Sequence, residues 1–370
     1  MIYFDNAANH KADDEIIKIF TKYLTEFGGN AESRHTYANK FRQLLKNKEN
    51  QLFSQIGLNS YEGMYFNSGT EIFNFIRFFI EQKSQNSNIV TSRLEHPAVL
   101  ANLQQTNTEI RYVKIDKFNQ FDIENIAKSI DDKTFMVILN FIQSETGLIQ
   151  KLDSVITKIK KINPQTLILI DTIQGFAKLD IPLDADFYAV SNHKICGLAG
   201  GVLICRKYMN LNLSDLQNSF RHQYYQQGRI EIPQLLTMFD YATKMFESLE
   251  INFKKVQTIN NFIRQKIECE FSKIAYCKFQ ETETTPYILQ IVFPDYDGAV
   301  LAGLLAEKDI MVSSGSACMA EAKTPSVALK EFNFNQREIF STLRLSFSPQ
   351  NTLDEAQTFI ETLKNVIQNY

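Results

Sequence analysis

The first two thirds of the chain alternate short apolar runs with helical patterns of hydrophobic residues. The apolar runs are typical of strands, because each is short and is bounded by polar or turn-forming residues. They lie at 63–69 (running into a turn), 88–92, 110–115, 134–141, 166–171, 187–191 and 200–207, with helical patterns at 70–82, 96–105, 122–130 and 152–162. Continuous apolar strands that alternate with helices predict an α/β fold, in which a large domain holds a mostly parallel sheet between helices.

The pattern changes after about residue 234. A long helical pattern reaches about residue 271, and strand patterns follow at 287–293, 310–314 and 342–348, with a helix at 297–308. A terminal helix is predicted from Thr352, because Glu355 stands three residues further on, which is the capping-box spacing. We expect a smaller α+β C-terminal domain of residues 1–14 and 241–370, and a large domain of residues 15–240.

The composition of the chain excludes some classes of function but does not identify one. Lys and Arg number 39 against 42 Asp and Glu, a net charge of −3, so no overall field favours nucleic acid or an anionic membrane. The five cysteines include no CxxC pair, which predicts neither a disulfide framework nor a zinc site and favours a reducing cytoplasm. The N-terminus has no signal-peptide pattern, and no apolar run reaches the roughly 18 residues of a membrane span.

Polar residues follow several of the predicted strands. Because the carboxyl ends of parallel strands meet at one edge of a sheet, where ligands bind, we expect these residues to lie along that edge. They are Ser68, Gly69, Thr70, His96, Ser144, Asp171, Gln174, Ser191, His193 and Lys194. This mixture of donors, cations and one carboxylate suits a phosphorylated cofactor that contains a ring nitrogen.

Several of these residues have both a functional and a structural interpretation. The stretch 68–70 is either an anion site at a helix N-terminus or an ordinary N-cap. Asp171 either holds a pyridinium N–H, with Gln174 near the ring hydroxyl, or caps a turn. His96 either stacks on the ring or begins a helix. Lys194 either forms a Schiff base, with Ser191 and His193 as phosphate donors, or is a surface lysine.

Two residues far along the chain extend this site. Cys318 lies in the small, polar stretch "SSGSACMAEAKTP", where an exposed reactive thiol is expected. The other four cysteines lie in or beside apolar runs and are predicted to be packing residues. Arg344 alternates with apolar residues on a strand, so it binds either a substrate carboxylate or an intramolecular acid.

Taken in order, these residues resemble the cysteine desulfurases, a group of class V aminotransferases within the fold-type I pyridoxal-phosphate enzymes. The opening "IYFDNAA" resembles the family's "YLDNAA". The stretches "GGNAESRH", "NSGTE", "EHPAV", "ETG", "IDTIQGFAKLDI", "SNHKICGLAGGVL", "SSGSAC" and "RLSFSPQNT" are similar to later family motifs in family order. The resemblance spans nearly the whole chain and implies the fold of a fold-type I pyridoxal-phosphate-dependent transferase.

The resemblance also implies a role for each residue. Lys194 would bind pyridoxal 5'-phosphate covalently and then move the proton on Cα of bound L-cysteine, with the ring stacked on His96. Cys318 would attack the substrate sulfur as a thiolate, leaving L-alanine and a persulfide, and Arg344 would bind the substrate carboxylate. The cofactor contacts would be Gly69, Thr70, His96, Ser144, Asp171, Gln174, Ser191, His193 and Lys194, with Asp171 on the pyridine nitrogen.

The sequence departs from the family pattern at several positions. Ser144 stands where the family has Asn, and Leu198-Ala199 replaces Gly-Pro after Lys194. Ala31 replaces Pro, and the stretch around Arg229 fits only loosely the family segment that reaches the phosphate of the neighbouring subunit. These differences indicate a divergent member of the family.

The resulting prediction is a cytoplasmic, homodimeric cysteine desulfurase that passes sulfur to an acceptor protein, either an iron–sulfur scaffold or a tRNA-thiolation protein. Another class V enzyme, such as a selenocysteine lyase or a β-eliminating lyase, is the first alternative. A non-catalytic accessory homologue is the second, although the presence of Lys194, Asp171 and Cys318 argues against it. Neither membrane association nor direct nucleic-acid binding is expected.

Overall fold

A computed structural model describes the chain except residues 28–32, 85, 208–211, 221–230 and 315–324. The chain folds into two compact units. The larger unit contains Ala12–Phe141 and Lys151–Glu247, and the smaller contains Met1–Lys11, Ile142–Gln150 and Ser248–Tyr370. The segment Ile142–Gln150 therefore belongs to the smaller unit, although the chain on both sides of it belongs to the larger.

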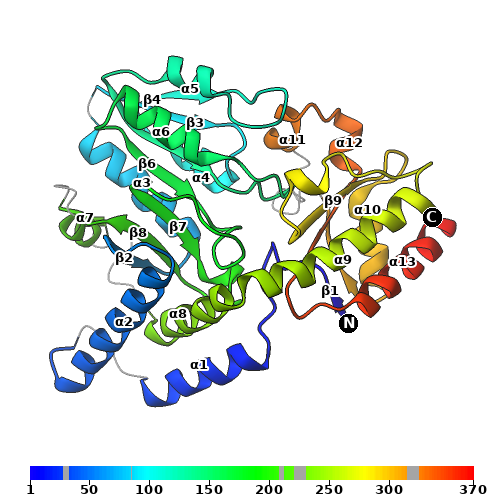
Figure 1. The fold of residues 1–370 in the computed structure, drawn as a ribbon, viewed down its shortest axis with the longest axis horizontal. Coiled ribbons are helices and arrows are strands. Elements are labelled where there is room, and N and C mark those ends of the chain that lie inside the picture. The colour runs from blue at the N-terminus through cyan, green and yellow to red at the C-terminus, as the bar shows by residue number, and fades with distance from the viewer. Residues whose placement is uncertain (28–32, 85, 208–211, 221–230, 315–324) are drawn as a thin grey trace. The chain divides into compact units, whose positions relative to one another are not determined.

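A seven-stranded sheet forms the centre of the larger unit (Figure 1). Its strands are β2 (Tyr61–Phe66), β8 (Gly201–Arg206), β7 (Phe187–Ser191), β6 (Leu167–Asp171), β5 (Thr134–Asn140), β3 (Asn88–Ser92) and β4 (Glu109–Val113), in that spatial order. Only β8 runs antiparallel to its neighbours. The predicted α/β fold with a mostly parallel sheet is confirmed, and each strand expected in this part of the chain is present.

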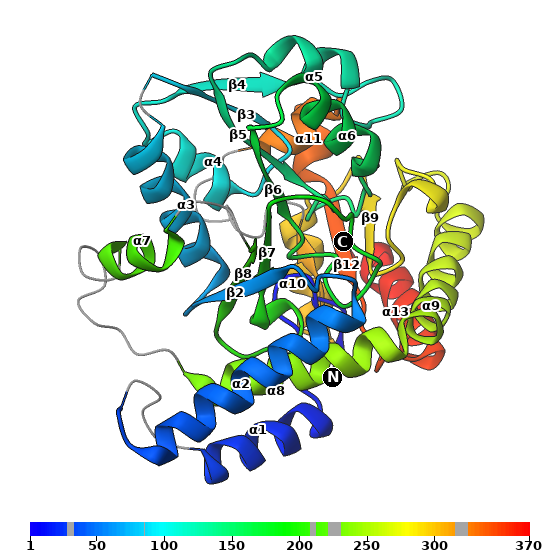
Figure 2. The same cartoon turned by 60° about the vertical axis from the view of Figure 1, so that its left-hand side comes forward.

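Helices cover both faces of this sheet. They are α1 (Asp14–Glu26), α2 (Thr36–Gln55), α3 (Gly69–Lys83), α4 (Pro97–Leu103), α5 (Ile123–Ser129), α6 (Leu152–Ile162), α7 (Leu213–Phe220) and α8 (Ile232–Glu247). Figure 1 and Figure 2 show α3 and α4 on one side of the sheet and α5 and α6 on the other. On the α3 side, Phe75 and Phe79 pack on strand residues such as Met136, Leu169 and Phe187. This burial fixes the position at which α3 begins.

The smaller unit is built on a three-stranded antiparallel sheet in the order β11-β12-β9. Its elements are β1 (Ile2–Tyr3), α9 (Leu249–Glu270), η3 (Glu281–Glu283), β9 (Ile288–Val292), α10 (Gly298–Ala306), β10 (Ile310–Met311), β11 (Ser313–Ser314), α11 (Val327–Glu331), α12 (Gln336–Phe340), β12 (Thr342–Ser346) and α13 (Leu353–Gln368). One face of the sheet packs on α9 and α13 through Leu289, Ile291, Leu343 and Leu345. The alternate residues Gln290 and Arg344 therefore lie on the opposite face.

Two of the elements expected after residue 234 are each divided in the structure. The expected strand 310–314 is two short strands, because β10 pairs with β1 while β11 pairs with β12. The long helical pattern is two helices, α8 and α9, which are separated at Ser248. Helices α1, α2 and α7 of the larger unit, and α11 and α12 of the smaller, were not predicted from the sequence.

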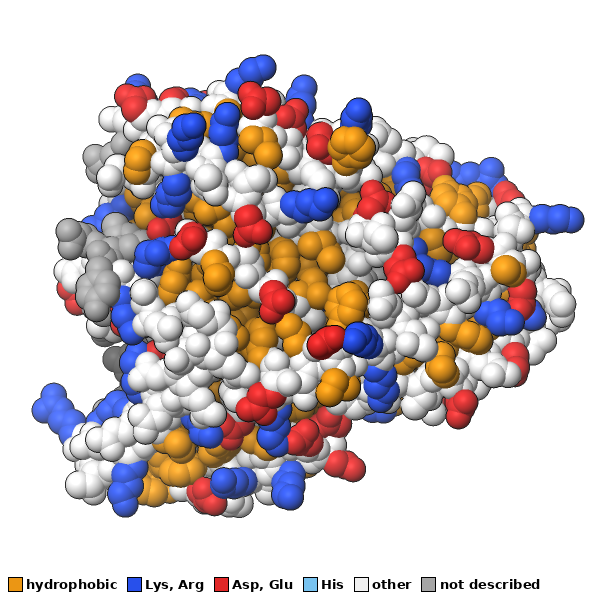
Figure 3. All heavy atoms as spheres, in the orientation of Figure 1, with side chains coloured by type: hydrophobic (Ala, Val, Ile, Leu, Met, Phe, Trp, Pro, Cys, Tyr) orange, Lys and Arg blue, Asp and Glu red, His pale blue; other side chains and the backbone are white. Residues whose placement is uncertain are grey.

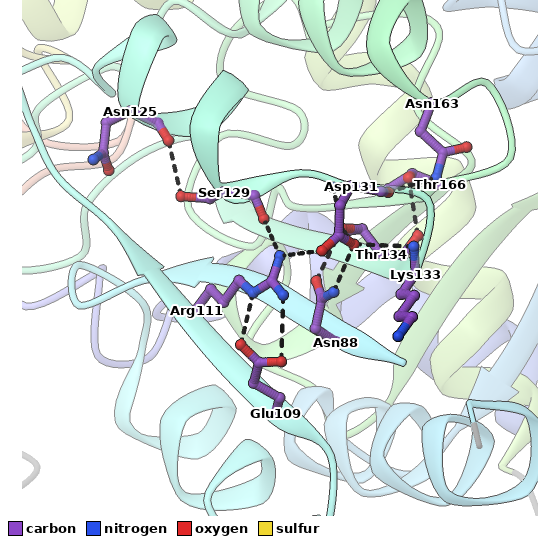
Figure 4. A network of polar contacts seen from close by, with 10 residues as sticks. All are labelled: Asn88, Glu109, Arg111, Asn125, Ser129, Asp131, Lys133, Thr134, Asn163 and Thr166. Carbon is purple, nitrogen blue, oxygen red and sulfur yellow. Dashed lines mark hydrogen bonds and ion pairs between the residues drawn. The ribbon is translucent and has the colours of Figure 1, made fainter. Parts of the chain in front are cut away.

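At the amino ends of β3 and β5, a polar network joins the strands (Figure 4). Asp131 accepts hydrogen bonds from Arg111 Nη1 at 2.8 Å and from Asn88 Nδ2 at 2.9 Å, and Arg111 also pairs with Glu109. These bonds, first of all that from Arg111, lower the pKa of Asp131 to about 2. A paired carboxylate of this kind is typical of a structural network.

The cysteines only partly follow their prediction. Cys196 and Cys205 are buried, and Cys277 packs partly buried against the core of the smaller unit. Cys269 is exposed, so its prediction as a packing residue was wrong. It lies next to the buried positions of α9, but on the solvent side of that amphipathic helix.

Charged groups of both signs are interspersed over the face drawn in Figure 3. That distribution accords with the small net charge of the chain. Among the helices that the structure describes, none combines the length and the apolar character needed to cross a bilayer.

The start of α13 provides a test of the fold. Thr352 caps the helix by accepting the N–H of Glu355, and Glu355 reaches back to the N–H of Thr352. We predict that Thr352→Ala lowers the free energy of unfolding by about 1 kcal/mol in urea titrations. Thr358→Ala, on the exposed middle of the same helix, is the control and should leave stability unchanged or slightly raised. Equal losses in both variants would contradict a specific role of the cap.

Candidate active site

Polar residues of the larger unit meet at the carboxyl edge of its sheet. Register places Asp171 opposite Asn140 on one side and Ala189 on the other, and both Phe66 and Ser191 pair with Gly201. The segments that follow β2, β3, β6 and β7 therefore start from the same edge, as the sequence predicted. They contain Gly69, Thr70, His96, Asp171, Gln174, Ser191, His193 and Lys194.

The N-terminus of α3 lies against the end of β7. Ser68 is the N-cap, since its Oγ accepts the N–H of Glu71 at 3.1 Å, so the structural interpretation of this serine is correct. A Cβ added to Gly69 would stand 3.0 Å from both Cβ and Oγ of Ser191. Glycine therefore lets the first turn of α3 approach Ser191 closely. The N–H groups of Gly69 and Thr70 have no intrahelical acceptor, which keeps this helix end suited to an anion.

Ser191 and His193 form a pair of potential phosphate donors. Ser191 is fully buried, and its Oγ lies 2.7 Å from Nδ1 of His193. The pKa of His193 is lowered to about 4, first by burial and then by the nearby positive charges of Lys194, His96 and Lys178. The imidazole is therefore neutral at neutral pH and can donate one N–H without adding charge.

Asp171 is a buried carboxylate at the end of β6. Its Oδ1 accepts the N–H of Ile173 at 2.9 Å. Burial raises the pKa of Asp171 to about 6, although the N–H of Ile173 and the charge of Lys194 both oppose this rise. A cationic N–H donor placed at this carboxylate would stabilise its ionised form.

His96 and Glu95 follow β3. His96 begins α4 as its N-cap, because Nδ1 accepts the N–H of Ala98 at 3.1 Å. The structural interpretation of His96 is thus correct, and this hydrogen bond leaves the flat face of the ring able to serve a second role. Glu95 was missed by the sequence analysis. It is 2% exposed, and one of its oxygens accepts bonds from Ser92 Oγ at 2.6 Å and the Asn140 N–H at 3.0 Å.

Burial is the main reason that the pKa of Glu95 lies well above its usual value, and the nearby Asp171 raises it further. Burial and the proximity of Asp171 thus both disfavour the ionised form of Glu95. Lys178, which is 6% exposed and close enough to act on His193, was also missed. The sequence did contain an indication of its role, because Lys178 is the final Lys of "IDTIQGFAK", which lies in the stretch already compared with the family.

The chain forms a short 3-10 helix at Lys194, η1 (Asn192–Lys194), and then a tight turn. Asn192 is buried, and its Nδ2 donates to the carbonyl of Ala199 at 3.1 Å. Gly200 has a φ of +130°, and a Cβ there would stand 2.3 Å from Asn192 Nδ2. The turn is therefore closed by Asn192 and Gly200, although Leu198-Ala199 stands where the family has Gly-Pro.

Arg344 and Ser144 belong to the smaller unit. Arg344 donates through Nη1 to the carbonyl oxygen of Ser144 at 3.0 Å, and through Nη2 to Asp5 and Ser313, both at 3.2 Å. The alternative of an intramolecular ion pair is thus correct for Arg344, with Asp5 as the acid. Ser144 contributes its backbone to this arginine group, which lies in a different unit from the strand-edge residues.

Glu145 lies next to Ser144 and accepts a hydrogen bond from Ser326 Oγ at 2.7 Å. Burial raises the pKa of Glu145 to about 7, opposed by Ser326, Arg344 and Gln143. This carboxyl group holds the N-cap of α11 to the segment that contains Ser144. Cys318, Arg229 and Ala31 lie outside the described residues.

These observations define an α/β protein whose donor groups, cations and buried carboxylates gather at the carboxyl edge of a mostly parallel sheet. The chain belongs to the class-V aminotransferase family, whose model, described as "Aminotransferase class-V", matches residues 2–359.

Similar proteins agree with this assignment. The chain is 24% identical, over all of its own length and 93% of the relative's, to a cysteine desulfurase of Trichormus azollae. It is 27% identical to the cysteine desulfurase IscS of Buchnera aphidicola subsp. Acyrthosiphon pisum, over 96% of this chain and 89% of that one. A solved NifS-like protein, 22% identical, has the same fold, with a TM-score of 0.87 and full coverage of both chains.

The buried carboxylate gives a prediction for the protein without a bound ligand. In the unfolded chain Asp171 titrates near 3.8 and in the folded protein near 6, so the folded state loses stability as pH rises between these values. We predict that Asp171→Asn is more stable than the wild type above pH 6 by about 3 kcal/mol, and that the advantage vanishes below about pH 4.

Urea titrations of both proteins without a bound ligand, between about pH 4 and 8, measure this difference. Asp132→Asn, at an exposed position of the same unit, is the control and should follow the wild type throughout. A pH-independent difference between Asp171→Asn and the wild type would show that the buried charge of Asp171 is not the cause.

Proposed function

We propose that the chain binds pyridoxal 5'-phosphate at the carboxyl edge of the larger sheet. Three observations support the fit. The first turn of α3 and the pair Ser191–His193 offer neutral donors to a phosphate, and Gly69 leaves the space between them free of a side chain. The buried Asp171 accepts the backbone N–H of Ile173, and a protonated ring nitrogen would add a cationic donor. Lys194 is close enough to influence both Asp171 and His193.

Each residue then has a defined task. Gly69, Thr70, Ser191 and His193 would hold the phosphate, Asp171 would accept the ring N–H, and Gln174 would contact the ring hydroxyl. His96 would lie against the ring, while Lys194 would anchor the cofactor aldehyde and then hold the proton taken from Cα of the substrate. When bound, the cofactor supplies an electron sink for bonds broken at the substrate's α and β carbons.

The reaction we propose is the conversion of L-cysteine to L-alanine, with Cys318 as sulfur acceptor. The thiolate of Cys318 forms a bond to the substrate sulfur, the carbon–sulfur bond breaks, and its electron pair returns to the substrate carbon, which is then protonated. The sulfur is left as a persulfide on Cys318. One thiol and L-cysteine thus yield one persulfide and L-alanine, so atoms and electrons balance without an external oxidant.

The observation that carries this function is the presence of Cys318 together with Lys194 and Asp171 in a chain whose full length matches proteins named cysteine desulfurase. A β-eliminating lyase would release sulfide and pyruvate and would not need Cys318. A selenocysteine lyase would prefer the selenium substrate. An accessory homologue would need neither Lys194 nor the buried Asp171.

We further propose that the chain works as a cytoplasmic homodimer. The persulfide would pass to an acceptor protein, either an iron–sulfur scaffold or a tRNA-thiolation protein. The homodimer and the transfer to an acceptor protein are supported by the resemblance to the family and by relatives that are named cysteine desulfurase IscS.

The covalent role of Lys194 is tested by visible absorbance. We predict that the purified wild type, given the cofactor, shows the absorbance band of a lysine-bound pyridoxal group. Lys194→Ala should lose this band, because no amine remains to bind the aldehyde. Lys133→Ala, at an exposed position, should keep it. A wild type that stays colourless with added cofactor would refute the cofactor assignment.

The role of Cys318 is tested by product analysis. Wild type, Cys318→Ala and Cys269→Ala are incubated with L-cysteine and reductant, and alanine, pyruvate and sulfide are measured together. We expect Cys318→Ala to keep the cofactor band and lose alanine formation, whereas Cys269→Ala, which removes an exposed cysteine, keeps both. Pyruvate and sulfide in equal amounts from the wild type would indicate an eliminating lyase instead.

A further inference from the structure

Gln290 lies beside Arg344 on the polar face of the small sheet. In the antiparallel pair of β9 and β12, Gln290 is the direct partner of Arg344, and on the other side of β12 the partner of Arg344 is Ser313. Directly opposed residues project from the same face of a sheet. Ser313, Arg344 and Gln290 therefore form one polar row across three strands.

The two ends of this row differ in their hydrogen bonding. At the Ser313 end, Arg344 Nη2, Ser313 Oγ and Asp5 are joined to one another. At the Gln290 end, both the Nε2 and the Oε1 of Gln290 are buried without a hydrogen-bond partner among the described residues, and so is the Nε of Arg344. Gln290 is only 3% exposed. An amide buried in this way is destabilising unless a partner arrives.

Neighbouring polar side chains on the same face do not supply that partner. Thr342 Oγ1 donates to the carbonyl of Ile339, and Ser346 Oγ already accepts the N–H of Ala7. Gln290 Oε1 needs a hydrogen-bond donor, and the Nε–H of Arg344 on the neighbouring strand is a suitable one. Gln290 Nε2 then still needs an acceptor, and a donor pair made of a guanidinium and an amide suits a carboxylate.

We infer that Gln290 is a second carboxylate-binding residue, which donates from Nε2 to the α-carboxylate of the amino-acid substrate beside Arg344. This inference rests on the proposed function and extends it. Asp5 offsets part of the charge of Arg344, so a second donor at the other end of the row strengthens the preference for a carboxylate over a neutral group. Gln290 thereby restricts the substrates to amino acids with a free α-carboxylate.

The experiment compares equilibrium binding of L-alanine, the product, with that of L-alaninamide, which lacks the carboxylate. Both are titrated by calorimetry into cofactor-loaded wild type, Gln290→Leu and Gln290→Glu. We expect Gln290→Leu to weaken L-alanine binding at least about tenfold and L-alaninamide binding less than about threefold. Gln290→Glu places a negative charge beside Arg344, and should weaken L-alanine binding further while sparing the amide.

Unfolding of the cofactor-free proteins separates this role from a structural one. Because Leu removes an unpaired buried amide, Gln290→Leu should be at least as stable as the wild type in urea. Gln357→Leu, at an exposed glutamine of α13, is the matched control and should change neither ligand affinity.

Two outcomes would overturn the inference: Gln290→Leu with the wild type's preference for L-alanine, or equal loss of affinity for both ligands. Failure of Gln290→Leu to fold leaves Gln290→Glu as the deciding variant, and an unchanged preference there overturns it equally. A wild type that does not prefer L-alanine to its amide refutes the proposed function itself, whatever the variants do.

Discussion

The burial of the Asp171 carboxylate is the constraint on which the proposed site depends. At the amino edge of the same sheet, Asp131 is paired with Arg111 and Asn88, and its pKa falls to about 2. At the carboxyl edge Asp171 is more deeply buried, accepts one backbone N–H and has its pKa raised to about 6. The first acid stabilises the fold at neutral pH, whereas the second costs stability there until a cationic donor binds.

The surroundings of Asp171 fit that requirement. Glu95 is close to Asp171, and its burial raises its pKa, which disfavours a second negative charge beside Asp171. His193 is neutral, which leaves the positive charge of the group to Lys194 and Lys178. A ligand with a positive ring nitrogen at one end and a phosphate at the other therefore matches the charges on this edge, and pyridoxal 5'-phosphate is such a ligand.

In the smaller unit, side chains are positioned by the alternation of residues between the two faces of a β-sheet. Leu343 and Leu345 face a core formed with α9 and α13, and Arg344 between them faces the other way. Asp5, from the opening "IYFDNAA", pairs with Arg344, which explains in physical terms why this N-terminal stretch belongs to the smaller unit. Strand register thus positions the polar row of Ser313, Arg344 and Gln290, whereas Asp171 and Lys194 are positioned by the ends of parallel strands.

The sequence predicted the sheet of the larger unit well, because its five inner strands, β8, β7, β6, β5 and β3, are buried on both faces and are therefore mostly apolar. It also placed Asp171 and Lys194 at one edge, since parallel strands end together. It did not predict α1 and α2, whose hydrophobic residues were not recognised as helical patterns. Glu95 and Lys178 were missed because burial of an ionisable group depends on packing between distant segments, which no local pattern reveals.

The central claim is that Lys194 is the residue that binds the cofactor. The most direct measurement is borohydride reduction of the cofactor-loaded protein, which makes the lysine–pyridoxal bond permanent, followed by peptide mapping with mass spectrometry. The account predicts the pyridoxyl group on the peptide that contains Lys194. A label on Lys178, the buried lysine near His193, or no stoichiometric label on any lysine, would contradict it.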